Sequence, residues 1–91
     1  MSIYDVHAVC RAALKDEQFR ATLTADPETA LSVFDLDPGE RDALLRGDVA
    51  TLYAQGAHEY VLMSLGRAEV LGLTVPEYMK RITQAEPHYI Y

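Results

Sequence analysis

One continuous apolar segment, residues 57–71, constrains the fold of this chain more than any other feature. We expect a helix here that ends near Gly72. A surface helix of a small domain needs only one apolar stripe, so a helix that is apolar on almost every side is either central or faces a second protein. The apolar residues that cannot share one stripe are Tyr60, Val61, Leu62, Met63, Leu65, Ala68, Val70 and Leu71. In a chain of 91 residues little protein is left to surround such a helix, which favours a subunit of a larger assembly.

Length and charge exclude several classes of partner. A chain of 91 residues makes one domain, and at this size folding buries only about 60–65% of the extended surface. The formal net charge is -6, from 14 acidic and 8 basic residues. No basic stripe is present, so the sequence predicts no nucleic acid partner and no membrane partner.

The expected location is cytoplasmic. The first residues lack a positively charged region followed by a long apolar run, and no apolar stretch approaches the length of a membrane span. The single cysteine, Cys10, rules out an intrachain disulfide, as is usual in a reducing compartment.

Helix start signals recur along the chain, whereas β alternation of useful length is missing. A short polar side chain before a helix accepts hydrogen bonds from its unpaired amides, and proline at the first position loses no useful donor. Such signals stand at Ser2, Asp16, Asp26-Pro27, Asp37-Pro38 (with Glu40 completing a capping box), Asp48 and Thr74-Val75-Pro76. Stops are expected near Lys15, at Gly47 and at Glu86-Pro87. The predicted fold is therefore all-α, a compact bundle of six or seven short helices in a single domain over residues 1–85, followed by an aromatic tail at 86–91.

Metal and catalytic sites find little support in the residue pattern. His7, His58 and His88 are too far apart in sequence for a helical metal pair, so no metal ligand is assigned. Acidic residues cluster at helix starts, where capping and the helix dipole explain them, so no catalytic residue is assigned either. Cys10 lies on the apolar stripe of the first helix and is expected to be a buried structural thiol. The alternative is that His7, three residues earlier, pairs with this thiol and lowers its pKa.

Two places in the chain look suited to contact with a partner. His58 stands two residues after Gly56 and next to Tyr60, at the start of the apolar helix. It either stabilises the helix start or is presented toward a ligand or partner subunit. The residues assigned to a substrate pocket or a partner-facing surface are Tyr53, His58, Tyr60 and Met63. The tail residues His88, Tyr89 and Tyr91 either fold back on the domain or dock on another chain.

The order of these segments resembles a known family. The elements are Asp26-Pro27-Glu28 with Ala30-Leu31, then Phe34-x-Leu36, Glu40-Arg41-x-Ala43-Leu44-Leu45 and Gly47-Asp48, then Leu52-Tyr53-x-x-Gly56-Ala57-His58, Leu62, Leu65, Leu71-Gly72-Leu73 and Pro76-Glu77-Tyr78. Over residues 8–82 the chain resembles the small alpha subunit of protocatechuate 4,5-dioxygenase and its relatives, the type II extradiol ring-cleavage dioxygenases. Members of that family often have proline after the Gly-x-His element, where this chain has Glu59.

The resemblance implies a division of labour between two subunits. In that family the beta subunit holds a non-heme ferrous iron, Fe(II), binds a catecholate, activates dioxygen and opens the ring beside the two hydroxyl groups. The small subunit covers the mouth of the active site and shapes the substrate pocket. By this resemblance the chain is not catalytic alone, binds no cofactor itself and assembles with a catalytic beta subunit.

Two alternatives remain open at this point. The front half, Phe19 to Leu45, also resembles small helical precursor or leader-like proteins of peptide-modification pathways, although those usually lack the Leu-Tyr-x-x-Gly-x-His element. The other alternative is a helical protein that self-associates as a homo-oligomer without any catalytic partner.

Overall fold

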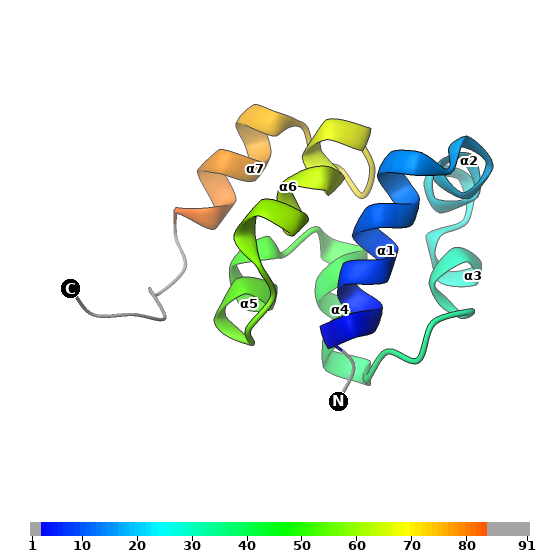
Figure 1. Ribbon diagram of the computed structural model, residues 1–91, viewed down its shortest axis with the longest axis horizontal. Helices are drawn as coiled ribbons and strands as arrows, with labels where there is room; N and C mark the ends of the chain where they lie inside the picture. The colour runs from blue at the N-terminus through cyan, green and yellow to red at the C-terminus, as the bar shows by residue number, and fades with distance from the viewer. Residues whose placement is uncertain (1–2, 84–91) are drawn as a thin grey trace.

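Seven helices make up the fold of residues 3–83, the part of the chain that the computed structural model describes (Figure 1). This part contains no strand, so the predicted all-α class is confirmed. The helices are α1 (Ile3–Lys15), α2 (Glu17–Ala25), α3 (Pro27–Leu31), α4 (Pro38–Arg46), α5 (Val49–Ala54), α6 (Glu59–Ala68) and α7 (Val75–Ile82). None of these described helices is long and apolar enough to cross a membrane.

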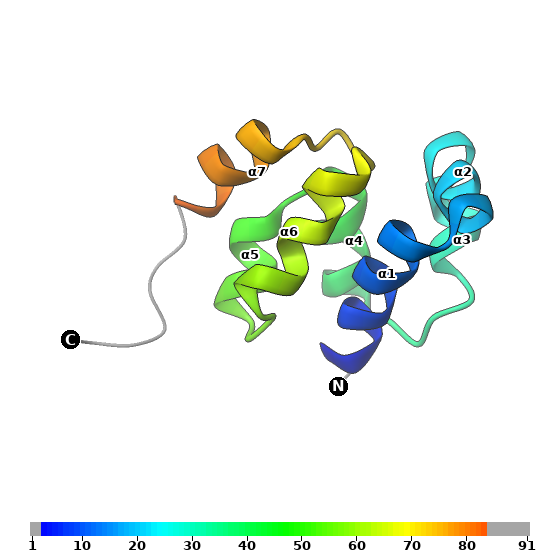
Figure 2. The ribbon, with the colours of Figure 1, turned by 45° about the horizontal axis from the view of Figure 1, so that its top comes forward.

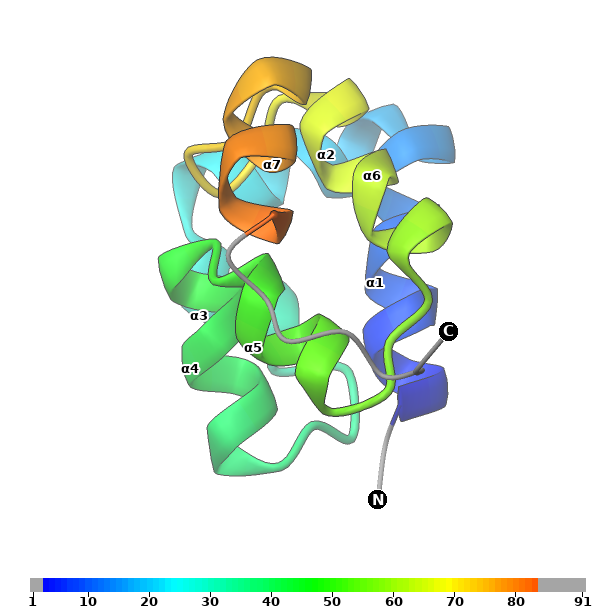
Figure 3. The same cartoon turned by 90° about the vertical axis from the view of Figure 1, so that its left-hand side faces the viewer.

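Helix α1 lies beside α6, and this contact forms the middle of the molecule (Figure 2). Helices α2 and α3 pack together and cover one end of α1, while α7 packs on α6 and α5 at the opposite end. Seen from that end, α4 and α5 lie below α7 and across from α6 (Figure 3). The core between the helices is built mainly from small and branched side chains that are almost fully buried, among them Val6, Val9, Cys10, Ala13, Leu44, Val49, Leu52, Leu62, Leu65 and Leu73.

The predicted helix starts are confirmed wherever the structure describes them. The Asp16 carboxylate accepts hydrogen bonds from the amides of Gln18 and Phe19. Asp37 and Glu40 form the expected capping box, in which each side chain accepts a hydrogen bond from the backbone amide of the other. The remaining caps are Asp26, Asp48 and Thr74, each of which accepts the amide three residues later. Ser2 and Glu86-Pro87 lie outside the described residues.

The expected apolar helix over residues 57–71 is wrong in its extent. Helix α6 spans Glu59–Ala68 and buries one stripe, formed by Leu62, Leu65 and Gly66. Ala57 and Val70 are buried as well, but they belong to the turns on either side of the helix. The helix ends because Glu69 adopts a left-handed conformation with a φ of 56°, which cannot continue an α-helix. An ordinary amphipathic helix and two buried turns therefore account for a segment that looked apolar on every side.

Helix α7 approaches α6 closely at Gly66. A β-carbon at this position would lie 2.9 Å from the carbonyl oxygen of Thr74 and 3.2 Å from the β-carbon of Tyr78. Glycine therefore lets the start of α7 pack directly on the backbone of α6. This contact sets the position of Tyr78 relative to the first turn of α6.

Candidate functional site

The start of α6 is tied to α1 by two histidines that are far apart in sequence. The imidazole of His58 caps α6, because its Nδ1 accepts a hydrogen bond of 3.1 Å from the amide of Tyr60. The amide of His58 itself donates a hydrogen bond of 3.0 Å to Nε2 of His7 on α1. Sequence reasoning placed His58 at the start of this helix but missed its link to His7, since the two residues are 51 positions apart.

Beyond His58, the exposed side of α6 carries an aromatic and a cationic side chain. Tyr60 is 59% exposed, and the guanidinium carbon of Arg67 lies 5.9 Å from the centre of its ring, within range of a cation–π interaction. Met63 lies between them along the helix and is half-buried, with part of its side chain packed against the core. We refer to His58, Tyr60, Met63 and Arg67 together as the α6 face.

Tyr53, the remaining residue assigned to the candidate site, lies on α5 and not on α6. It is half-buried on α5, where it packs against the core and lies near enough to Tyr78 to contribute to that residue's raised pKa. Tyr78 is buried on α7, and its hydroxyl donates a hydrogen bond to the backbone carbonyl of Glu59. Burial raises the pKa of Tyr78 to about 12, so this phenol stays a donor at physiological pH. The first turn of α6 is therefore held by α1 on one side and by α7 on another.

Cys10 is an inert structural thiol. It is fully buried in the core, and burial raises its pKa to about 12. The alternative in which His7 lowers the pKa of this thiol is wrong, because His7 instead accepts the amide of His58. The pKa of His7 is itself lowered, first by burial and then by the positive charge of Arg11 and the neighbouring His58.

The carboxylates that were set aside as helix caps do act as caps. The Asp26 carboxylate accepts hydrogen bonds from the hydroxyl and amide of Thr29, and these bonds lower its pKa. Within residues 3–83 no group of three or more histidine, cysteine, aspartate or glutamate side chains is placed to hold a metal ion. The tail residues His88, Tyr89 and Tyr91 lie outside the described residues, so docking of the tail stays a prediction.

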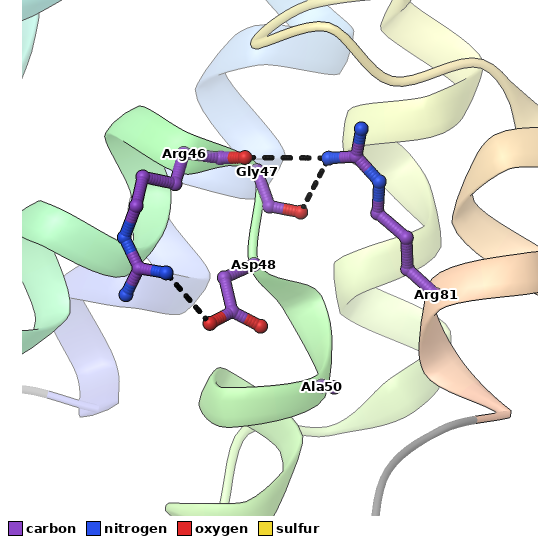
Figure 4. Close-up of a pocket in the computed structure, with 5 residues that line it drawn as sticks. All are labelled: Arg46, Gly47, Asp48, Ala50 and Arg81. Carbon is purple, nitrogen blue, oxygen red and sulfur yellow. Dashed lines mark hydrogen bonds and ion pairs between the residues drawn. The ribbon is translucent and has the colours of Figure 1, made fainter.

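A small open pocket lies where α4, α5 and α7 meet, a feature that sequence reasoning missed (Figure 4). Its volume is about 240 Å³, and its lining residues are Arg46, Gly47, Asp48, Ala50 and Arg81. One Arg81 nitrogen donates to the carbonyl oxygens of Arg46 and Gly47, which end α4, while Arg46 pairs with Asp48. A cation at a helix C-terminus is favourable because it complements the exposed carbonyl groups. We interpret this pocket as a packing contact between helices. The basic last turn of α4 is the sequence feature that could have indicated it.

The fold and the site define a small all-α protein whose distinctive surface is the aromatic and cationic face of one helix. The chain belongs to the family described as "aromatic-ring-opening dioxygenase LigAB, LigA subunit", which matches residues 8–85. It is thus a small subunit of an aromatic-ring-opening dioxygenase, and the resemblance seen in the sequence is confirmed. No significant match was found among curated proteins or among solved structures.

Proposed function

We propose that this chain is a non-catalytic small subunit that docks on the iron-bearing catalytic subunit of an extradiol dioxygenase in the cytoplasm. In this proposal the α6 face covers the mouth of the partner's active site and shapes the pocket for the aromatic substrate. The non-heme Fe(II) belongs to the catalytic subunit. The family match carries the proposal, since it covers residues 8–85 and names the subunit of a two-component ring-opening enzyme.

The chemistry of the α6 face suits a cover over a reactive site. Tyrosine, methionine and arginine are enriched in protein interfaces, where large side chains exclude water and polar tips supply directional hydrogen bonds. Ring opening with dioxygen benefits from a closed site, because excluded water cannot quench reactive intermediates. Tyr60 offers an exposed ring with a phenol tip, and Arg67 beside it offers a positive charge for an anionic group.

The rigidity of the first turn of α6 supports the same proposal. His7 and Tyr78 fasten this turn from two helices, and His58 caps it. An interface residue that is already held in place loses little conformational entropy on docking. Tyr60, directly after the capped turn, is therefore well suited to act as an anchor.

The test is a substitution series in the complex with the cognate catalytic subunit. We expect Tyr60→Ala to weaken binding by at least about tenfold, or about 1.4 kcal/mol, as for a central aromatic anchor. Val33→Ala is the matched control, because Val33 is an exposed apolar residue that follows α3, a helix that packs mainly on α2. Dissociation constants and kcat/KM would be measured for both variants. Equal affinity for Tyr60→Ala and the unaltered chain would contradict a role for the α6 face.

A separate measurement tests where the chemistry resides. We expect iron and oxygen uptake with catechols to follow the catalytic subunit, and the chain alone to show neither. Iron content would be determined for the chain, for the partner and for the purified complex. One tightly bound iron per chain with turnover would overturn the assignment, as would a chain that only self-associates and never binds a catalytic subunit.

A further inference from the structure

His7 and His58 each use an imidazole nitrogen as a hydrogen-bond acceptor. Nε2 of His7 accepts the amide of His58, and Nδ1 of His58 accepts the amide of Tyr60. An imidazole nitrogen can accept a hydrogen bond only while it carries no proton, and a fully protonated imidazole has two donors and no acceptor. The start of α6 is therefore fastened by two acceptors that histidine protonation destroys.

We propose that His7 and His58 form a proton-sensitive clasp, which holds the start of α6 against α1 at neutral pH and releases it when the imidazole of His7 is protonated. Release frees the amide of His58 at the beginning of the α6 face. Regulation of docking by pH follows only if the α6 face binds the catalytic subunit, so that part rests on the proposed function. The clasp itself belongs to this chain alone.

The surroundings of His7 favour its neutral imidazole. The charged and titratable groups that act on His7 are Arg11 on α1 and His58 at the start of α6, and Glu59 directly follows His58 in the chain. The positive charge of Arg11 disfavours a second positive charge on the neighbouring His7. Protonating the clasp thus sets a cation beside Arg11 while removing the acceptor for the amide of His58.

The direction of the pH effect follows from the lowered pKa of His7. The unfolded chain binds this proton more readily than the folded chain, so stability rises with pH wherever the two differ in protonation. The full contribution is present above the unfolded pKa of about 6.5 and is lost as the pH falls through that value toward the folded pKa. The clasp therefore opens on the acidic side of neutrality.

Amide hydrogen exchange on the full chain tests the clasp directly. We expect the protection factor of the His58 amide to fall several-fold, and by no more than about tenfold for a single imidazole, between pH 7.5 and pH 5.5, after correction for the intrinsic pH dependence of exchange. The amide of Ala57 is the internal reference, because it donates to the carbonyl of Leu52 and depends on no histidine. The midpoint of the loss should coincide with the imidazole titration followed by NMR. Unchanged protection, or a midpoint unrelated to imidazole titration, would overturn the clasp.

Two substitutions separate titration from the mere presence of a side chain. Gln carries a carbonyl acceptor that does not titrate, so His7→Gln should keep the His58 amide protected at pH 5.5. His7→Ala should lose the protection of the His58 amide at both pH values. If His7→Gln loses protection between pH 7.5 and 5.5 as the unaltered chain does, His7 is not the sensor and the proposal fails.

Binding to the catalytic subunit at the same two pH values tests the regulatory part. We expect the unaltered chain to bind at least about threefold more weakly at pH 5.5 than at pH 7.5, and the variant His7→Gln to lose less affinity. A pH-dependent clasp in a chain that binds no catalytic subunit would refute the proposed function alone. Tight binding at pH 7.5 together with flat amide protection would refute the clasp alone.

Discussion

Gly47, at the turn between α4 and α5, is the position where a single added methyl group should do most damage. Its φ of 66° is left-handed, which costs a residue with a β-carbon about 1–2 kcal/mol. A β-carbon there would also lie 2.6 Å from the carbonyl oxygen of Leu71 and 2.7 Å from a terminal nitrogen of Arg81. Overpacking of this kind costs about 1–3 kcal/mol. We therefore expect Gly47→Ala to lower the free energy of unfolding by about 2–5 kcal/mol, less the few tenths to 1 kcal/mol by which alanine restricts the unfolded chain.

Gly72 provides the matched control. Its φ of 76° is also left-handed, but a β-carbon there meets nothing within 4 Å. Gly72→Ala should thus show the dihedral cost alone, and the difference between the variants measures the clash at Gly47. Urea unfolding followed by circular dichroism gives both free energies, and each kcal/mol should also appear as about 4–8 °C in Tm. Equal losses for the two variants would refute the argument, because they would show that the close contacts at Gly47 relax at no cost.

Three further predictions concern the ends of α6 and the core. Tyr78→Phe removes the donor to the carbonyl of Glu59 and should cost about 0.5–1.5 kcal/mol in urea unfolding, whereas an unchanged midpoint would show that this hydrogen bond contributes nothing net. Glu69→Gly should increase the free energy of unfolding by about 1 kcal/mol and so raise Tm, because glycine freely adopts the left-handed conformation at the helix end; a lower Tm would contradict this. Cys10 should react with thiol reagents only as fast as the chain opens, since it is buried and its pKa is raised to about 12, and rapid labelling under native conditions at pH 8 would contradict its burial.

The helix starts could be predicted from the sequence because each is decided within a few residues. Asp16, Asp26 and Asp48 accept amides two or three positions ahead, and Asp37 with Glu40 closes a reciprocal pair of hydrogen bonds. Such interactions need no distant partner, so the local order of side chains determines them. The all-α class follows from the same local signals.

The extent of α6 could not be predicted from its apolar residues. Hydrophobicity indicates that a residue is buried but not whether a helix or a turn buries it, and Ala57 and Val70 are buried in turns. Glu69 and Leu71 adopt left-handed conformations that neither residue type favours. The turn that contains Glu69 and Leu71 leads into α7, which packs against Gly66, and no local sequence pattern predicts that contact.

The sequence by itself therefore determined the helices, their caps, the family order of segments and the candidate residues His58 and Tyr60. Only the tertiary structure decided that His7 meets His58 and that Tyr78 holds the carbonyl of Glu59. The physical reason is the range of the interactions. A cap is formed between neighbours in the chain, whereas the clasp joins residues 51 positions apart, which become neighbours only after α1 and α6 have packed side by side.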